Sequence, residues 1–253
     1  MRGGTIRLFR FAGIDVFLHF TWFLVAAIFV TDYMRRYQSP VWGVIEYISL
    51  FAIVLIHEFG HALACRQVGG VANRIILWPL GGIAFVNPPR RPGAYLWSIA
   101  AGPLVNVALI PILAAAGNFV SQSENSLTPT DAYRFINDLR YINLGLLIFN
   151  MLPVFPLDGG QIVRGLLWFP FGEIRSLQIA SVIGLVGGAL IGIIGLMVGL
   201  AGSSAGWWWV LLAFFLLSRA WYGWQQAKAM MAASKMGIPI SPSPTATENP
   251  SPR

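Results

Sequence analysis

Charged residues are scarce in this sequence: they make up 11% of its 253 residues, whereas apolar residues make up 56%. A soluble domain carries about 25% charged residues, so the shortage excludes an ordinary soluble protein. The abundance of apolar residues excludes a disordered chain as well. A mean hydropathy of +0.66 instead indicates a membrane protein with several spans.

Cysteine is nearly absent too. The one cysteine, Cys65, has no second cysteine with which to form an intrachain disulfide, so no disulfide framework holds the fold. The first apolar run of the chain lacks a small-residue cleavage site. We therefore interpret this run as a first transmembrane segment and not as a removable signal peptide.

Long apolar stretches are what the sequence has in quantity. A helix needs about 20 mostly apolar residues to cross a bilayer, and we expect six such helices. They are 16–31, 41–66, 93–120, a segment from residue 141 that Pro153 and Pro156 interrupt, and two helices within 176–218 that are separated at 202–206. Residues 73–87, rich in Ile, Leu and Val, predict a short β-hairpin or re-entrant segment that enters the membrane from inside. The expected fold class is an all-α polytopic membrane protein with this one hairpin.

Arginine and lysine are unevenly distributed between the two sides of the expected spans. With the N-terminus inside, thirteen of the 17 Lys and Arg residues lie in inner segments and four in outer segments. Because inner loops carry the excess of positive charge, we predict a multi-pass protein of the cell membrane with both termini in the cytoplasm. The net charge of +7 does not indicate nucleic-acid binding, since the basic residues are spread over loop ends without a binding patch.

The second expected span contains the sequence His57-Glu58-Phe59-Gly60-His61. Residues four apart lie on one face of a helix, so the two imidazoles can share one metal ion, and Glu58 is placed to hold a water on that ion. Ionisable groups inside a bilayer are costly and usually have a function. The alternative is a pair of histidines that make interhelical hydrogen bonds.

A catalytic zinc site needs a third protein ligand. Asp158 follows the two prolines that interrupt the fourth span and precedes Gly159 and Gly160. Broken helix at membrane depth is tolerated where it is buried or lines a cavity. Counting the helical rise from the outer end of each span places His57 and Asp158 at similar depth, toward the cytoplasmic side. A helix-capping role for Asp158 is the alternative.

These two motifs resemble those of the site-2 protease family, the intramembrane zinc metalloproteases. The resemblance covers about residues 10–225. Its further matches are Pro79-Leu80-Gly81-Gly82, Gly102-Pro103-Leu104-Val105-Asn106, Asn143 and Asn150.

The resemblance implies that His57, His61 and Asp158 bind one Zn²⁺ per chain and that Glu58 is the catalytic acid and base. It also implies substrates that are membrane-embedded proteins, mostly with a single span. The spacing between the ligand motifs leaves no room for a PDZ domain. Residues 237–253, with five prolines among serines and threonines, predict a disordered tail that is too short for a CBS pair. We therefore expect a minimal catalytic core over residues 1–236, and the oligomeric state stays open.

Four residues are weaker candidates for contacts with the substrate. The hairpin around Gly81 and Gly82 either pairs with an unwound substrate by strand addition or is a structural re-entrant loop. Asn106 and Asn150 are amides in apolar spans. They either face the site and stabilise an oxyanion or make interhelical hydrogen bonds.

The sequence thus favours an intramembrane zinc endopeptidase that cleaves peptide bonds in or near transmembrane segments. A catalytically silent homologue that only binds membrane proteins is the first alternative, although it would have no need for Glu58. A metal-dependent transporter is the second, but such a protein is expected to contain inverted repeats, and none is visible.

Overall fold

The computed structural model describes residues 4–23, 26, 36–78, 81–122 and 130–236. The chain divides into two compact units, Met1–Asn150 and Met151–Arg253. The expected catalytic core over residues 1–236 stays a prediction, and the expected tail at 237–253 lies outside the described residues.

The first unit contains a four-stranded sheet in the order β1-β2-β3-β4. Its strands are β1 (Thr5–Phe11), β2 (Ile14–His19), β3 (Val71–Trp78) and β4 (Gly81–Asn87). β1 and β2 pair antiparallel, β2 and β3 pair parallel, and β3 and β4 pair antiparallel. The predicted hairpin at 73–87 is therefore present as β3 and β4, although its turn, with Pro79 and Leu80, lies outside the described residues. The expectation of one hairpin was wrong, because two N-terminal strands extend it into a larger sheet.

Residues 16–19 correct the expected start of the first span, since they belong to β2 and not to a transmembrane helix. Ile14 and Val16 are buried in the core, whereas Asp15 between them forms an ion pair with Arg7 at 2.7 Å. This alternation with a period of two is that of a strand with one buried face. Most of the remaining span, up to residue 31, lies outside the described residues.

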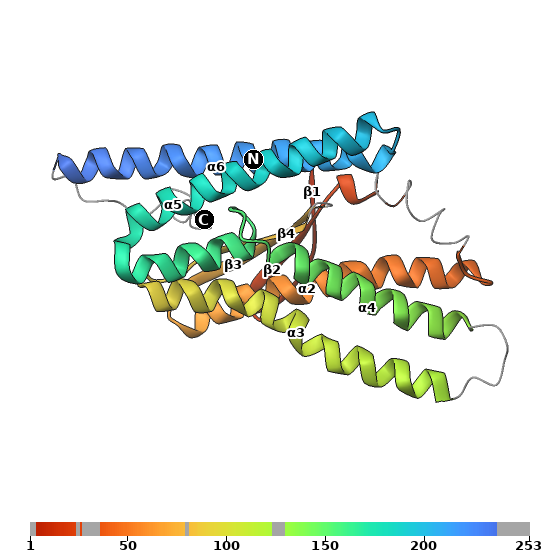
Figure 1. Ribbon diagram of the computed structural model, residues 1–253. Coiled ribbons are helices and arrows are strands. Elements are labelled where there is room, and N and C mark those ends of the chain that lie inside the picture. The colour runs from red at the N-terminus through yellow and green to blue at the C-terminus, as the bar shows by residue number, and fades with distance from the viewer. Residues whose placement is uncertain (1–3, 24–25, 27–35, 79–80, 123–129, 237–253) are drawn as a thin grey trace. The chain divides into compact units, whose positions relative to one another are not determined.

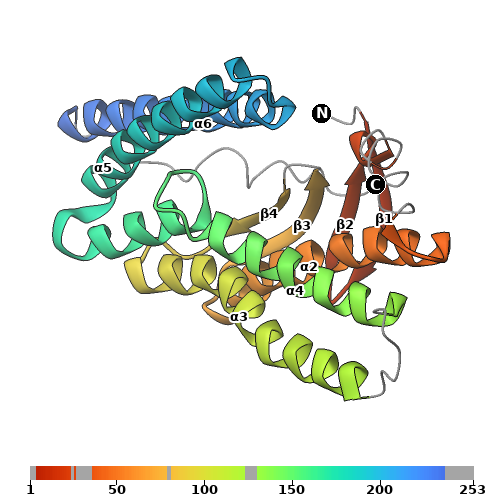
Figure 2. The ribbon, with the colours of Figure 1, turned by 45° about the vertical axis from the view of Figure 1, so that its right-hand side comes forward.

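Within its described residues, the first unit also contains three helices: α2 (Pro40–Gln67), α3 (Pro92–Gln122) and α4 (Asp131–Asn150). Figure 2 shows α2 running along the sheet. Val54, Ala62 and Cys65 of α2 pack against Ile75 and Leu77 of β3. The second and third expected spans agree with α2 and α3. α4 begins earlier than the expected start near residue 141, and it ends before Pro153.

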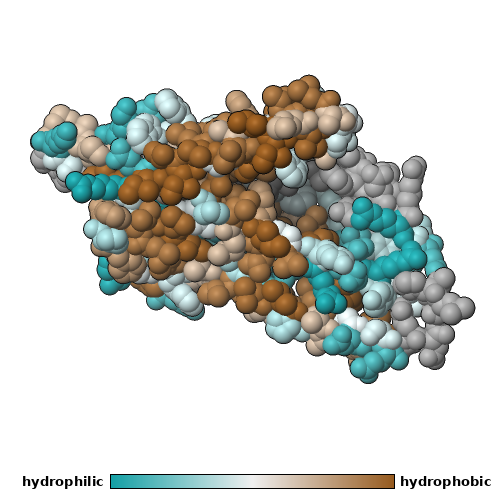
Figure 3. Space-filling model, in the orientation of Figure 1, coloured by the Kyte–Doolittle hydropathy of each residue, from teal (hydrophilic) through white to brown (hydrophobic). Residues whose placement is uncertain are grey.

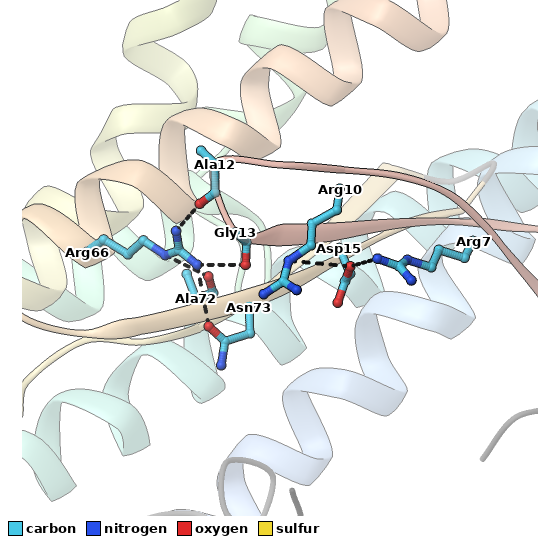
Figure 4. A network of polar contacts seen from close by, with 8 residues as sticks. All are labelled: Arg7, Arg10, Ala12, Gly13, Asp15, Arg66, Ala72 and Asn73. Carbon is cyan, nitrogen blue, oxygen red and sulfur yellow. Dashed lines mark hydrogen bonds and ion pairs between the residues drawn. The ribbon is translucent and has the colours of Figure 1, made fainter. Parts of the chain in front are cut away.

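The C-terminal end of α2 is fastened to the sheet by Arg66 (Figure 4). Its guanidinium donates hydrogen bonds to the carbonyl oxygens of Ala12 and Gly13 in the β1–β2 turn and of Ala72 in β3. Gly13 has a φ of 74°, which favours glycine and allows this tight turn. The end of α2 that follows the histidine motif is thus held against two strands.

The N-terminal end of α2 is fastened to α4 by a polar cluster. The Tyr37 hydroxyl lies 2.9 Å from a carboxylate oxygen of Glu46 in α2 and 3.1 Å from one of Asp138 in α4. The Asp131 carboxylate accepts hydrogen bonds from the backbone N–H groups of Gln38 and Ser39. α2 is therefore held at both ends, with the histidine motif between them.

The second unit is an antiparallel pair of long helices, α5 (Asp158–Leu200) and α6 (Ser204–Lys235), which lie side by side in Figure 1. The predicted interruption near 202–206 agrees with the turn between them. α5 itself consists of two helical segments, because Gly172 has a φ of 77° and breaks the helix.

Large apolar side chains are exposed along both helices of the second unit, and Figure 3 shows apolar side chains covering their outer surface. Examples are Leu190, Met197, Phe214 and Trp221. Exposed apolar surface of this extent marks a membrane or partner contact. Among the described helices, α2, α3 and α5 are long and apolar enough to cross a membrane. Six spans are therefore not established.

Candidate metal centre

The two histidines of the α2 motif converge on one point. His57 and His61 are 3% and 5% exposed, and their Nε2 atoms lie 3.1 Å apart. They are one helical turn apart on the same face of α2, as the spacing predicted.

The other nitrogen of each ring is held by an oxygen acceptor from α3. His57 Nδ1 lies 2.5 Å from the side-chain oxygen of Asn106, and His61 Nδ1 lies 2.9 Å from the backbone carbonyl oxygen of Ser98. Since such oxygens only accept, both Nδ1 atoms donate, and in a neutral imidazole this leaves the lone pair on Nε2. Two lone pairs at this separation repel each other unless a cation lies beside them. The pair therefore fits a metal ion, and hydrogen-bonded Nδ1 atoms are usual for histidine ligands of metals.

The acceptor of His57 is itself fixed by a second asparagine. Asn106 donates through Nδ2 to the side-chain oxygen of Asn143 in α4 at 2.8 Å, and Asn143 donates to the Asn106 backbone carbonyl at 2.9 Å. Both side chains are buried. The interhelical hydrogen bond that the sequence left open for Asn106 is thus present, and it connects three helices to one ligand.

Close packing of α2 against α3 brings these partners within reach. A Cβ added at Gly60, inside the histidine motif, would lie 2.7 Å from the backbone oxygen of Ala101, so a larger residue would force the helices apart. A Cβ added at Gly102 would overlap with the His61 imidazole. Gly60 therefore allows the close approach of α3, and Gly102 makes room for the His61 ring.

Glu58 is held by the edge strand of the sheet. Its Oε2 accepts a hydrogen bond from the backbone N–H of Ala84 in β4 at 2.8 Å. A Cβ added at Gly82 would overlap with the Glu58 side chain, so only glycine lets the carboxylate approach the strand here. Gly82, expected at the substrate, thus lies beside the expected acid and base.

Asp158 belongs to the second unit, where it is the first residue of α5. A Cβ added at Gly159 or Gly160 would overlap with the backbone of residues 151–155, which folds over the start of the helix. The two glycines after the aspartate therefore allow this close return of the chain. Like the two histidines, Asp158 offers an atom of the kind that binds zinc.

The remaining sequence candidates lie at the ends of elements. Asn150 is the last residue of α4 and is partly exposed, and Gly81 is the first residue of β4. Their contact with a substrate stays a prediction. Sequence reasoning did not identify the Ser98 carbonyl as a partner of His61, and it noted Asn143 only as a motif match. A buried amide in an apolar helix was the available signal for Asn143.

Comparison with known proteins shows the family of this chain. Residues 45–194 match the model of peptidase family M50. Zinc metalloprotease MJ0392 of Methanocaldococcus jannaschii is 33% identical over 180 residues, which are 71% of this chain and 50% of that protein. The putative zinc metalloprotease sll0528 of Synechocystis is 30% identical over 190 residues, or 71% of this chain and 48% of that protein.

A solved structure, the site-2 protease from Methanocaldococcus jannaschii, matches with a TM-score of 0.62 and 30% identity over 87% of this chain and 95% of that one. The chain therefore belongs to peptidase family M50, the site-2 proteases. The resemblance drawn from the motifs is confirmed, and the long apolar helices agree with a membrane protein. The chain spans about half the length of the two metalloproteases above.

Proposed function

We propose that the chain is an intramembrane zinc endopeptidase that hydrolyses peptide bonds in or near the transmembrane segments of membrane-tethered proteins, with single-span proteins as its main substrates. The observation that carries this proposal is the convergence of the His57 and His61 Nε2 atoms, with both Nδ1 atoms engaged, next to Glu58. The M50 relatives, which are named as zinc metalloproteases, support it.

The proposed ligands of one zinc per chain are His57, His61 and Asp158. Two imidazoles and one carboxylate leave one coordination position open, as catalytic zinc requires. When bound, the zinc lowers the pKa of a coordinated water and polarises the scissile carbonyl. The hydrogen bonds from Nδ1 to Asn106 and Ser98 orient the two imidazoles so that their Nε2 atoms face this ligand set.

Glu58 acts as the acid and base. Its carboxylate, oriented by the hydrogen bond from the Ala84 N–H, takes a proton from the attacking water and then passes it to the nitrogen of the leaving amine. Because Gly82 approaches the carboxylate closely, the strand that holds Glu58 also lies where the substrate has to arrive.

We further propose that β4 pairs with the unwound substrate by strand addition. β4 is the last strand in the sheet order, and an edge strand presents backbone groups to an extended peptide. Glu58 takes one of these groups, the Ala84 N–H, at the place where the peptide would pair. A helical substrate hides its peptide bonds, so an unwinding edge near Glu58 is chemically needed. Gly81 and Gly82 would keep side chains away from the pairing peptide.

The proposed location is the cell membrane, crossed several times, with both termini in the cytoplasm. The distribution of Lys and Arg supports this orientation. It is tested with cysteines at two exposed positions, Ser203 directly before α6 and Ser234 in the last turn of α6. An impermeant thiol reagent is expected to label the first from outside and not the second. The reverse pattern would overturn the orientation.

The catalytic proposal is tested by comparing Glu58→Gln, Asp158→Ala and Asp158→Asn. Glu58→Gln should keep the zinc content but lower the cleavage of a single-span model substrate by about 10²–10⁴-fold, the usual contribution of an acid–base group. Asp158→Ala should lose zinc, because two imidazoles alone make a poor site, and Asp158→Asn should be intermediate. Zinc content and cleavage are measured on the same preparations. Cleavage by Glu58→Gln at the parent rate would show that the mechanism is wrong.

A further inference from the structure

We propose that Gly184 and Gly187 of α5 and Gly223 of α6 are positioning residues for Asp158. The three glycines leave a space, here called the seat, that Val154 and Phe155 occupy. These two residues belong to the loop 151–157, which leads to Asp158. The inference rests on the proposed role of Asp158 as a zinc ligand. α5 carries a stripe of closely spaced glycines, Gly184, Gly187, Gly188 and Gly192. The inference assigns the first two a role beyond the packing of α5 against α6.

The seat is formed by three contacts too close for any side chain. A Cβ added at Gly187 would lie 2.5 Å from Cγ2 of Val154, and one at Gly184 would lie 2.5 Å from the backbone oxygen of Phe155. A Cβ added at Gly223 would lie 2.9 Å from the ring of Phe155. Real Cβ atoms do not come this close, so a substitution would displace the Val154 or Phe155 side chain and, at Gly184, the loop backbone.

The loop is stiff enough to pass such a displacement on to Asp158. The Leu157 N–H donates to the Val154 carbonyl oxygen at 2.8 Å, and the Gln161 side chain donates to the Pro156 carbonyl oxygen at 3.0 Å. The close approach of Gly160 to Phe155 ties the same loop to the first turn of α5. Because Asp158 lies between these fixed points, a shift of Val154 or Phe155 moves its carboxylate.

Other glycines of the same stripe face α6 and not the loop. A Cβ added at Gly188 would lie 3.1 Å from the Leu217 side chain, and one at Gly192 would lie 3.2 Å from Cβ of Ala213. The regular spacing of small residues in α5 thus has two uses, because one group allows α6 to approach and the other receives the ligand loop. Gly192 is therefore a matched control for Gly187.

The experiment measures Co²⁺ binding to the purified full chain, since the visible spectrum of bound Co²⁺ reports the number and arrangement of its ligands. Gly187→Ala is expected to weaken Co²⁺ binding about 10–100-fold, as for the loss of a group that orients a ligand, and to change the spectrum. Gly192→Ala is expected to leave both unchanged. Adding Val154→Ala to Gly187→Ala removes the methyl groups that would clash and should restore the parent spectrum.

Val154→Ala alone is an independent test in case Gly187→Ala does not fold, because it leaves the seat partly unfilled without creating a clash. It should loosen the loop and weaken Co²⁺ binding, while α5–α6 packing stays intact. Equal losses in Gly187→Ala and Gly192→Ala would overturn the inference, as would a parent-like spectrum in both Gly187→Ala and Val154→Ala. If Asp158→Ala left the spectrum unchanged, the ligand assignment would fail and the inference with it. If Asp158→Ala changed the spectrum and the seat variants did not, only the inference would fail.

Discussion

The two units of this protein hold their proposed zinc ligands in different ways. In the first unit, each histidine is oriented by a hydrogen bond from Nδ1 to an oxygen of α3, and one of these partners is fixed again by α4. In the second unit, Asp158 follows a loop that is held by close packing against glycines. Hydrogen bonds dominate the first arrangement, whereas close packing dominates the second.

The chemistry of the ligands explains this difference. An imidazole has two nitrogens, and only a partner on one of them decides which nitrogen binds the metal. An ionised carboxylate has two equivalent acceptor oxygens and no tautomer to select. For metal binding it therefore only has to be held in the correct position. We expect zinc binding to respond to changes of polarity in the first unit, beside any response to size, and to changes of size alone in the second unit.

We expect the largest effect from removing the two proposed zinc ligands of the first unit. His57→Ala together with His61→Ala should abolish zinc binding, because the single remaining carboxylate cannot hold the ion. Elemental analysis of detergent-purified protein should give near one zinc per chain for the parent and none for the double variant. Full retention of zinc would show that the site lies elsewhere.

Gly102→Ala tests the contrast between the two units, because it changes size and not polarity beside a histidine that is oriented by a hydrogen bond. The added methyl group would overlap with the His61 ring and should lower zinc affinity at least about tenfold, in the range seen when ligand orientation is lost. Gly117→Ala in the same helix is the control, since its added Cβ would meet no atom closer than 3.5 Å. Titration with a competing zinc chelator measures both affinities.

Asn106→Leu changes polarity at nearly constant size. It leaves the Nδ1–H of buried His57 without its acceptor, so zinc affinity should fall about 10–100-fold. Asn143→Leu should have a smaller effect, because it acts only through Asn106. Asn118→Leu, at an exposed position of the same helix, should have none. Parent-like affinity of Asn106→Leu would mean that His57 is oriented by packing, and the contrast between the units would disappear.

The smallest expected effect lies away from the metal, at Tyr37. Burial raises the pKa of Tyr37, and the neighbouring carboxylates of Glu46 and Asp138 raise it further. A raised tyrosine pKa contributes stability that is fully present below the ordinary value of about 10 and is lost as the pH rises above it. Tyr37→Phe should therefore lower the stability by about 1–3 kcal/mol at pH 8 and flatten its decline above pH 10, with zinc content unchanged. Thermal unfolding in detergent at pH 8 and pH 11 measures this effect. An unchanged pH profile would contradict it.

Local sequence patterns were enough for much of the fold. The spacing of His57 and His61 predicted one helical face, and the apolar runs predicted α2, α3 and the turn between α5 and α6. The start of the first span was misplaced because residues 16–31 form one apolar run, whereas the strand that ends at His19 depends on parallel pairing with β3, more than fifty residues later along the chain. Such pairing has no local signal.

By itself, the sequence determined the chemical class of this protein, because ligand spacing on a helix and the scarcity of charge follow from residue types alone. Only the tertiary structure decided how the groups are held: which α3 oxygen each histidine uses, which strand binds Glu58, and which glycines receive the loop before Asp158. The physical reason is that hydrogen-bond partners and close contacts depend on how helices from distant parts of the chain approach each other. Glycines and asparagines of identical type therefore take different roles according to what lies opposite them.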